Sequence, residues 1–286
     1  MKRGENDLSD NWIIANLENA LGTWNGKLAE IWSLVTQSPQ TFKGGDIWNM
    51  VVNINGGLKA IGYGLLVLFF AMSIFKSTAS FRDFQRPEYA LKHFIRFVAA
   101  KLAITYAMDI MTTIFTICGG IVAKVTENMG GMVNASATLP TEISTAIENV
   151  GFWASIPLWL VTILGSLFIT IMSFIMIMTV YGRFFKLYMY TALAPVPLAT
   201  FAGEVTSSTG KAFIKNYVGV CMEGAVIVLA CLVFSAFMSS GTPVVDTNIT
   251  TVTLVWKYIG ETIFNMLVLV GLIKGSDQII RTMLGI

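Results

Sequence analysis

Long apolar runs alternate with short polar segments along most of the chain. Five of these runs hold about 18 or more residues, the length at which an apolar helix can cross a bilayer. We place them at residues 58–75, 102–123, 156–181, 217–238 and 258–275. The pattern predicts an all-α fold: a polytopic membrane protein with about five transmembrane helices in residues 56–286.

The first polar-rich segment carries a helical pattern of its own. Its apolar residues recur at three- and four-residue spacing over residues 12–35, which predicts one apolar stripe on a long helix. Ser9 or Asp10 can cap its start, and Pro39 follows its end. We assign residues 1–55 to an extracytoplasmic amphipathic region. The stripe fits three settings: the membrane interface, a partner helix, or the chain's own membrane domain.

Residues 187–202 form an apolar segment that two prolines interrupt. Pro195 and Pro197 remove backbone donors and break a regular helix. Broken backbone at membrane depth is tolerated where protein covers it or where it lines water. We therefore expect a re-entrant or interfacial elbow over residues 187–202 and not a sixth span.

Composition supports a membrane protein. The chain has 286 residues, of which 55% are hydrophobic and 13% charged, and its mean hydropathy is +0.68. Soluble domains carry about 25% charged residues, so this chain has too few charges to cover a water-facing surface. A net charge of +2 does not indicate nucleic-acid binding over the whole surface. The three cysteines fall inside apolar runs and are interpreted as small buried hydrophobic residues.

The distribution of basic residues predicts the orientation. With five spans, one side of the membrane collects most of the lysines and arginines, and cytoplasmic loops are the side that carries them. This places the N-terminus outside and the C-terminus in the cytoplasm. Six spans would leave Lys211 and Lys215 outside, which the rule disfavours.

The chain offers little of the chemistry that an enzyme needs. His93 is the one histidine, so a zinc site is not expected, and no phosphate-binding loop of the G-x-x-x-x-G-K type occurs. We expect no catalytic residues, no metal and no cofactor.

Two acids lie inside apolar runs and are candidates for function. Asp109 and Glu223 enter from the same predicted side, on the order of 10 Å deep. Charged groups in spans face a bundle interior or a watery cavity. The functional hypothesis is a polar lumen lined by these acids and by Lys101. The structural alternative is pairing, for example of Glu223 with Lys101 or with a lysine of a neighbouring subunit.

A basic cytoplasmic surface is the second candidate site. It either anchors the chain at the interface through long side chains or docks a partner. Its expected members are Arg82, Arg86, Lys92, Arg183, Lys186, Lys211 and Lys215.

The segments around the elbow resemble a known family. YGRFFK at 181–186 is followed by ALAPVPLA at 192–199 and GKAFIKNY at 210–217, between two spans. This arrangement is similar to the TrbL-type polytopic inner-membrane subunit of bacterial conjugation and type IV secretion systems, as found on mobile elements of Gram-positive bacteria. The shared pattern covers residues 156–238. The chain lacks the long soluble C-terminal region of larger relatives, so no function of such a tail is expected here.

The resemblance implies a role in DNA transfer. The protein would form a homo-oligomeric ring in the cytoplasmic membrane, within the path of single-stranded DNA and its attached relaxase. Its partners would be other channel subunits and cytoplasmic ATPases, besides the lipid bilayer.

Two other functions share the same sequence features. A small-solute transporter or ion channel would also need intramembrane acids and a broken helix, although the two halves show no convincing internal repeat. A non-conducting scaffold of a phage or secretion apparatus would need the N-terminal helix more than the acids.

Overall fold

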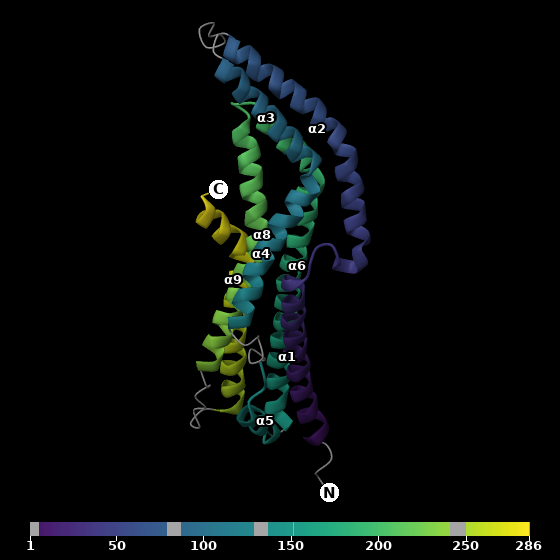
Figure 1. Cartoon of the computed structure of the whole chain (residues 1–286). Helices are drawn as coiled ribbons and strands as arrows, with labels where there is room; N and C mark the ends of the chain where they lie inside the picture. Colours follow the sequence, from purple (N-terminus) through teal and green to yellow (C-terminus); the bar gives the residue numbers. More distant parts are fainter. Residues whose placement is uncertain (1–5, 79–86, 129–136, 151, 241–249, 286) are drawn as a thin grey trace. The chain divides into compact units, whose positions relative to one another are not determined.

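The computed structural model describes residues 6–78, 87–128, 137–150, 152–240 and 250–285, and every regular element in these ranges is helical. The elements are α1 (Asn6–Thr36), η1 (Phe42–Gly45), α2 (Asp46–Thr78), α3 (Pro87–Thr105), α4 (Ala107–Asn128), α5 (Thr141–Glu148), α6 (Phe152–Leu193), α7 (Pro195–Ala199), η2 (Thr200–Ala202), α8 (Ser207–Ser240) and α9 (Thr251–Leu284). Figure 1 shows them in sequence colours. The predicted all-α fold is confirmed.

Five helical segments of the described chain are long and apolar enough to cross a membrane. They are Phe42–Lys76, Ala107–Glu127, Ser155–Leu193, Ser207–Phe237 and Thr251–Leu284. Each of these segments contains or overlaps one predicted span, so the predicted set of five is confirmed. Four segments are longer than the predicted spans, whereas the second begins later than predicted because residues 102–105 belong to α3. The proline segment forms only the short elements α7 and η2.

The helix before the elbow is longer than the sequence pattern indicates. α6 continues through residues 187–193 and ends at Leu193, so the break falls at Ala194. A proline is tolerated in the first turn of a helix, where its missing N–H has no intrahelical acceptor. The two prolines therefore start the next short helix, α7, and leave the end of α6 intact.

The chain folds into two compact units, each built from three separate segments. The first unit contains Met1–Val35, Lys124–Tyr181 and Val226–Ser276, and the second contains Thr36–Ala123, Gly182–Ala225 and Asp277–Ile286. Helices α6, α8 and α9 each contribute residues to both units, so neither unit is a continuous stretch of sequence.

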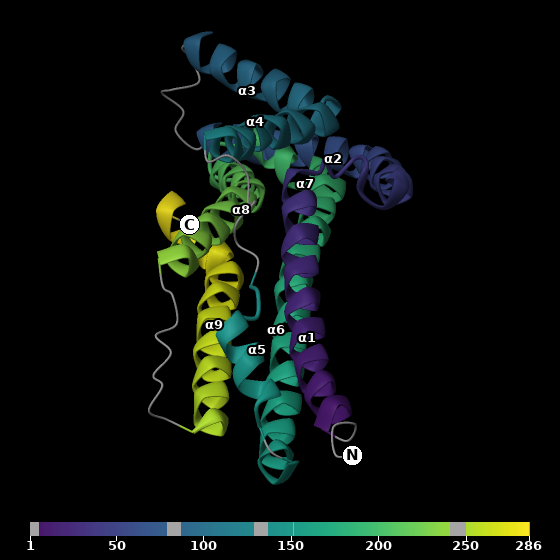
Figure 2. The ribbon, with the colours of Figure 1, turned by 90° about the horizontal axis from the view of Figure 1, so that it is seen from below.

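In the first unit, α1 packs along the early part of α6, and both ribbon views show them side by side (Figures 1 and 2). The stripe expected on residues 12–35 is buried here, with Leu17, Trp24 and Ile31 almost fully covered. Contacts in the same order along both helices make them parallel: Trp12 to Trp159, Asn16 to Ser166, Lys27 to Phe174 and Glu30 to Tyr181. Of the three settings open to the stripe, the structure shows packing on the chain's own apolar helix.

A small cluster closes the same unit around α5. Pro140 precedes the first turn of α5, and Ile143 and Ile147 are buried against α1, α6 and α9. Gly165 lies so close to α9 that an added Cβ would be 2.7 Å from Cγ2 of Ile259. The apolar side of this short helix therefore faces the core of the unit.

The core of the second unit lies where α2, α3, α7 and η2 meet, and α4 and α8 complete it. The elbow contributes mainly small side chains to this core, those of Ala194, Ala199 and Ala202. Close packing of small residues lets helices approach one another within a membrane. This packing covers the broken backbone of the elbow with protein.

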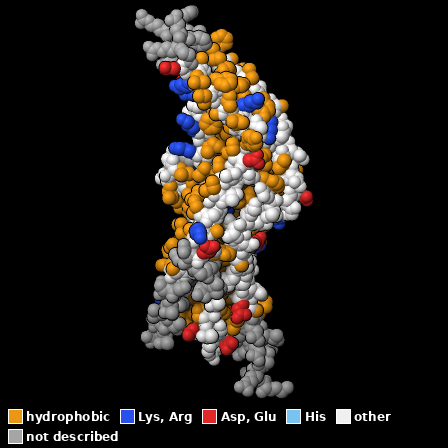
Figure 3. Space-filling model, viewed as in Figure 1, with side chains coloured by type: hydrophobic (Ala, Val, Ile, Leu, Met, Phe, Trp, Pro, Cys, Tyr) orange, Lys and Arg blue, Asp and Glu red, His pale blue; other side chains and the backbone are white. Residues whose placement is uncertain are grey.

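Apolar side chains also dominate the described surface. Figure 3 shows hydrophobic atoms over much of the visible face, with charged groups scattered between them. Along α6 the exposed large residues include Leu160, Phe168, Ile171 and Met178. Lipid, and not water, is the solvent that such a surface favours.

Candidate functional site

A buried arginine is the most unusual charged group of the second unit. Arg183 lies in α6 with 1% of its surface exposed. Its Nε–H donates to the carbonyl of Val220 (3.3 Å) and its Nη2 to the carbonyl of Cys221 (3.2 Å), both in α8. Because an uncompensated charge is costly in a span, such residues face the interior and pair there. Arg183 therefore ties α6 to α8 from inside the fold.

A glycine on α8 makes room for this guanidinium. A Cβ added to Gly224 would lie 2.7 Å from both Cζ and Nη1 of Arg183. Atoms do not approach so closely without a shift of one partner. A side chain at residue 224 would therefore displace the buried guanidinium of Arg183.

The neighbouring acid, Glu223, is also buried, with 1% of its surface exposed. Lys186, one turn beyond Arg183 on α6, places its Nζ 3.5 Å from Glu223 Oε2 and 3.5 Å from Oδ1 of Asp277 in α9. One lysine thus joins two carboxylates from two different helices. Arg183 also interacts electrostatically with Glu223.

Arg281 in α9 connects Asp277 to a residue of α8. The Nε–H of Arg281 donates to Asp277 Oδ2 (3.1 Å), and its Nη1 donates to Oδ1 of Asn216 (3.1 Å). We call Arg183, Lys186, Asn216, Glu223, Asp277 and Arg281 the ion network. It connects α6, α8 and α9, and all its members lie inside candidate spans. A network that pairs its charges stabilises one arrangement of these helices more than any single pair would.

The elbow is held by close contacts to glycines. A Cβ added to Gly62 in α2 would lie 2.9 Å from the carbonyl oxygen of Pro195. Gly210 in α8 approaches Thr200 in the same way, at 2.9 Å from its Oγ1. Pro195 is buried, whereas Pro197 is half-buried and accepts a hydrogen bond from Thr200 Oγ1 (2.7 Å). The elbow is therefore fixed from both sides.

A buried polar chain runs beside the elbow. Asn55 of α2 donates to the carbonyl of Thr191 (2.7 Å), and the Thr191 hydroxyl lies 3.5 Å from the Tyr217 hydroxyl. Tyr217 in turn donates to the carbonyl of Met111 (3.0 Å). These contacts link α2, α6, α8 and α4. Hydrogen bonds of this kind satisfy polar groups that neither lipid nor water reaches.

A second cluster of charges is exposed, next to the elbow. Glu204 lies 3.2 Å from Nη1 of Arg96 and 3.7 Å from Nζ of Lys92, both in α3. The hydrogen bond and charge of Arg96 lower the pKa of Glu204, to which Lys92 and His93 add, while partial burial opposes the shift. More than half of the Glu204 side chain is exposed, so water screens these pairs.

The predicted lumen residues lie in different surroundings. Asp109 is exposed in the first turn of α4, and Lys101 is exposed on α3. Glu223 is buried and pairs with Lys186, which is neither of the two partners considered for it. The lumen itself stays a hypothesis.

Only some of the residues predicted to form the basic surface are exposed. Lys92, Lys211 and Lys215 are exposed. The expectation that Arg183 lies on that surface is wrong, because its guanidinium is buried against α8, and Lys186 is half-buried within the ion network. Arg82 and Arg86 lie outside the described residues.

The one histidine, His93, is buried. It lies within α3, is 5% exposed, and places its Nδ1 3.4 Å from Oγ of Ser73. Within the described ranges, no group of three or more His, Cys, Asp or Glu side chains is placed to hold a metal ion.

These features define a polytopic helical membrane protein whose charged residues bind its helices to one another. Residues 24–195, more than half of the chain, match the TrbL/VirB6 plasmid conjugal transfer like protein family. The chain therefore belongs to the TrbL/VirB6 conjugal transfer family. Neither the curated proteins nor the solved structures contain a match.

Proposed function

We propose that the chain is a membrane-embedded channel or scaffold subunit of a conjugative type IV secretion apparatus. In this role it helps single-stranded DNA with its relaxase to cross the cytoplasmic membrane. The observation that carries the proposal is the family match over residues 24–195. The five apolar helices of the described chain support it, because such a subunit has to be anchored in the bilayer.

The ion network gives the proposed subunit a rigid interior. Charged residues inside spans are expensive, and this chain uses six polar or charged side chains to connect three helices. Glu223 then has a structural role, because it neutralises Lys186 and Arg183. Asp109 and Lys101 remain the candidates for a polar lumen, since both side chains are exposed.

The proposal includes an assembly and an orientation. Several copies form a homo-oligomeric ring, with the N-terminus outside and the C-terminus in the cytoplasm of a Gram-positive bacterium that carries the mobile element. The exposed Lys211 and Lys215 face cytoplasmic ATPases and other channel subunits, and the positive-inside rule supports this side for them.

Transfer frequency in a mating assay tests the proposal. Donors carry the intact element, an in-frame deletion of this gene, or the deletion with the gene restored in trans. Transfer should collapse in the deletion and return on complementation. Unchanged transfer in the deletion would refute the proposal, and ion or solute flux in liposomes would then test the transporter function.

A further inference from the structure

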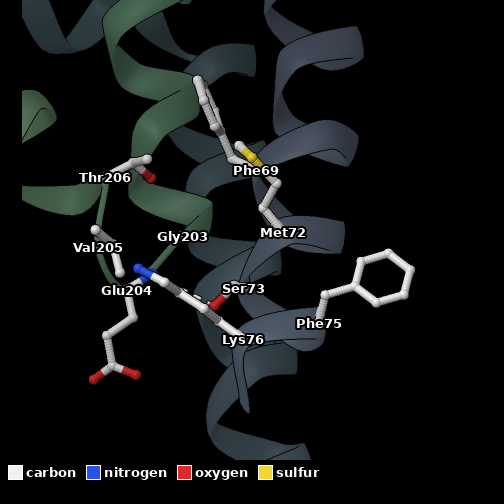
Figure 4. A pocket seen from close by; sticks show the side chains of 9 residues that line it. All are labelled: Phe69, Met72, Ser73, Phe75, Lys76, Gly203, Glu204, Val205 and Thr206. Carbon is white, nitrogen blue, oxygen red and sulfur yellow. Dashed lines mark hydrogen bonds between the residues drawn. The ribbon is translucent and has the colours of Figure 1, made fainter. Parts of the chain in front are cut away.

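An apolar hollow lies between the end of α2 and the segment that follows the elbow, within the second unit. It has a volume of about 480 Å³ and is lined by Phe69, Met72, Ser73, Phe75, Lys76, Gly203, Glu204, Val205 and Thr206. Figure 4 shows the ring of Phe75 and the carboxylate of Glu204 pointing outward in opposite directions. This volume falls within the range of about 300–1,000 Å³ that is typical of small-molecule sites.

The polar end of the hollow carries an excess of positive charge. Lys76 lines it directly, and among the described residues no ion pair of Lys76 is seen. Lys92 and Arg96 approach the same end through their contacts with Glu204. Among the described residues, three cations therefore surround one carboxylate, which is an excess of two positive charges.

The hollow also lies at the end of an apolar run, where a lipid headgroup would meet its acyl chains. The apolar run of α2 ends at Phe75, and Lys76 is the last residue of the first candidate span. Helix α3, which carries Lys92 and Arg96, is not among the candidate spans and exposes an apolar stripe of Leu91, Phe94, Ile95, Val98 and Leu102. A helix with such a stripe beside basic residues favours the membrane interface.

We propose that this hollow binds an anionic phospholipid. One acyl chain lies against Phe69, Met72 and Val205, and the phosphate pairs with Lys76 and Lys92. Basic residues at an interface attract anionic lipid, and the apolar walls add the burial that a free phosphate could not use. The bound lipid joins the end of α2 to the elbow. This inference does not rest on the proposed role in DNA transfer.

Retention of lipid by the purified full-length protein in detergent tests the site. Protein is incubated with equal amounts of phosphatidylglycerol and phosphatidylcholine, and the bound ratio is measured by native mass spectrometry. Lys76→Gln with Lys92→Gln should lower the phosphatidylglycerol preference at least about fivefold. The matched control, Lys211→Gln with Lys215→Gln, removes the same charge from exposed residues that do not line the hollow and should leave the preference unchanged.

A second pair of variants tests the apolar part without changing charge. Val205→Trp fills the hollow and should reduce retention of phosphatidylglycerol, whereas Val233→Trp on α8 should not; the two valines are 64% and 63% exposed. Equal retention of both lipids by the unmodified protein would overturn the proposal. So would equal losses in either matched pair, or a Val205→Trp protein that binds as the unmodified protein does.

Discussion

The two clusters of charge in the second unit use the same side-chain chemistry in opposite surroundings. Glu223 is buried and meets Lys186 at 3.5 Å, whereas Glu204 is exposed and meets Arg96 at 3.2 Å. The shorter distance belongs to the exposed pair, whose charges water and salt screen, whereas the Glu223 side chain is shielded from both. Surroundings, and not distance, decide how much each pair contributes.

The buried cluster also constrains its neighbours more strongly. Arg183 fills the space that Gly224 leaves and donates to two α8 carbonyls, and Lys186 pairs with acids on two helices. Removing one partner of a buried pair leaves a charge with nothing to neutralise it, which is far more destabilising than the loss of an exposed pair. The experiments on Glu223, Gly224 and Glu204 below test this contrast, and one on Gly62 tests the packing of the elbow.

The largest effect is expected from Glu223→Gln. It leaves Arg183 and Lys186 with Asp277 as the remaining acid of the network, and should lower the free energy of unfolding by roughly 3–5 kcal/mol. Thermal unfolding in detergent measures this change. The control is Asp109→Asn, the same chemical change at an exposed acid, which should stay within about 0.5 kcal/mol. Equal destabilisation by the two variants would contradict the contrast.

Gly224→Ala should destabilise the protein without removing any charge. The new methyl group displaces the Arg183 guanidinium and breaks at least one charged hydrogen bond, with a loss of about 2–3 kcal/mol relative to its control. That control is Gly271→Ala in α9, where an added Cβ meets nothing within 4 Å. Equal unfolding temperatures of the Gly224→Ala and Gly271→Ala proteins would show that Arg183 can move freely.

Gly62→Ala tests the contact between α2 and the elbow. Its Cβ would meet the carbonyl of Pro195, and the backbone must shift by a few tenths of an ångström, so we expect a loss of about 1–2 kcal/mol. Gly64→Ala, two residues away with nothing within 4 Å, is the control and should be neutral or slightly stabilising. Limited proteolysis near residues 194–206 provides a second readout, which should change only in Gly62→Ala.

Glu204→Gln should have a small effect. The exposed pair with Arg96 contributes less than about 1 kcal/mol, and high salt should remove the difference between the variant and the unmodified protein. Unfolding is compared at low and high salt. A large difference that persists in high salt would show that Glu204, like Glu223, is shielded from solvent.

The pH dependence of the exposed pair is the finest test. The pKa of Glu204 is lowered in the folded state, so its contribution is present above the ordinary pKa and is lost as the pH falls through the folded value. The small difference between the unmodified protein and Glu204→Gln should therefore exist at neutral pH and vanish in acid. A difference that grows on acidification has the opposite sign and would contradict the assignment.

The sequence was sufficient for the fold because bilayer crossing depends on local properties. Five apolar runs, the stripe on residues 12–35 and the two prolines each act through their own segment, and each appears in the structure. Helix ends were less predictable. α6 continues to Leu193 because Pro195 lies after the end of this helix. A proline in that place disrupts a helix less than a proline in its middle would.

The ion network could not be read from the sequence in the same way. Arg183 directly follows an apolar run, a position typical of an interfacial anchor, and its burial depends on α8, about 40 residues later. The adjacent pair Glu223 and Gly224 was the available signal, since an acid inside a span needs a partner and a glycine can admit one. Which cation fills that space depends on tertiary packing.

The most direct test of the account is conjugative transfer from a deletion strain that carries different copies of this gene. The account predicts that the unmodified gene and Gly271→Ala restore transfer, whereas Gly224→Ala and an empty vector do not, with protein levels in the membrane measured in parallel. Transfer from the empty-vector strain at the level of the intact element would contradict the proposed function. Full activity of Gly224→Ala would contradict the role of the buried arginine.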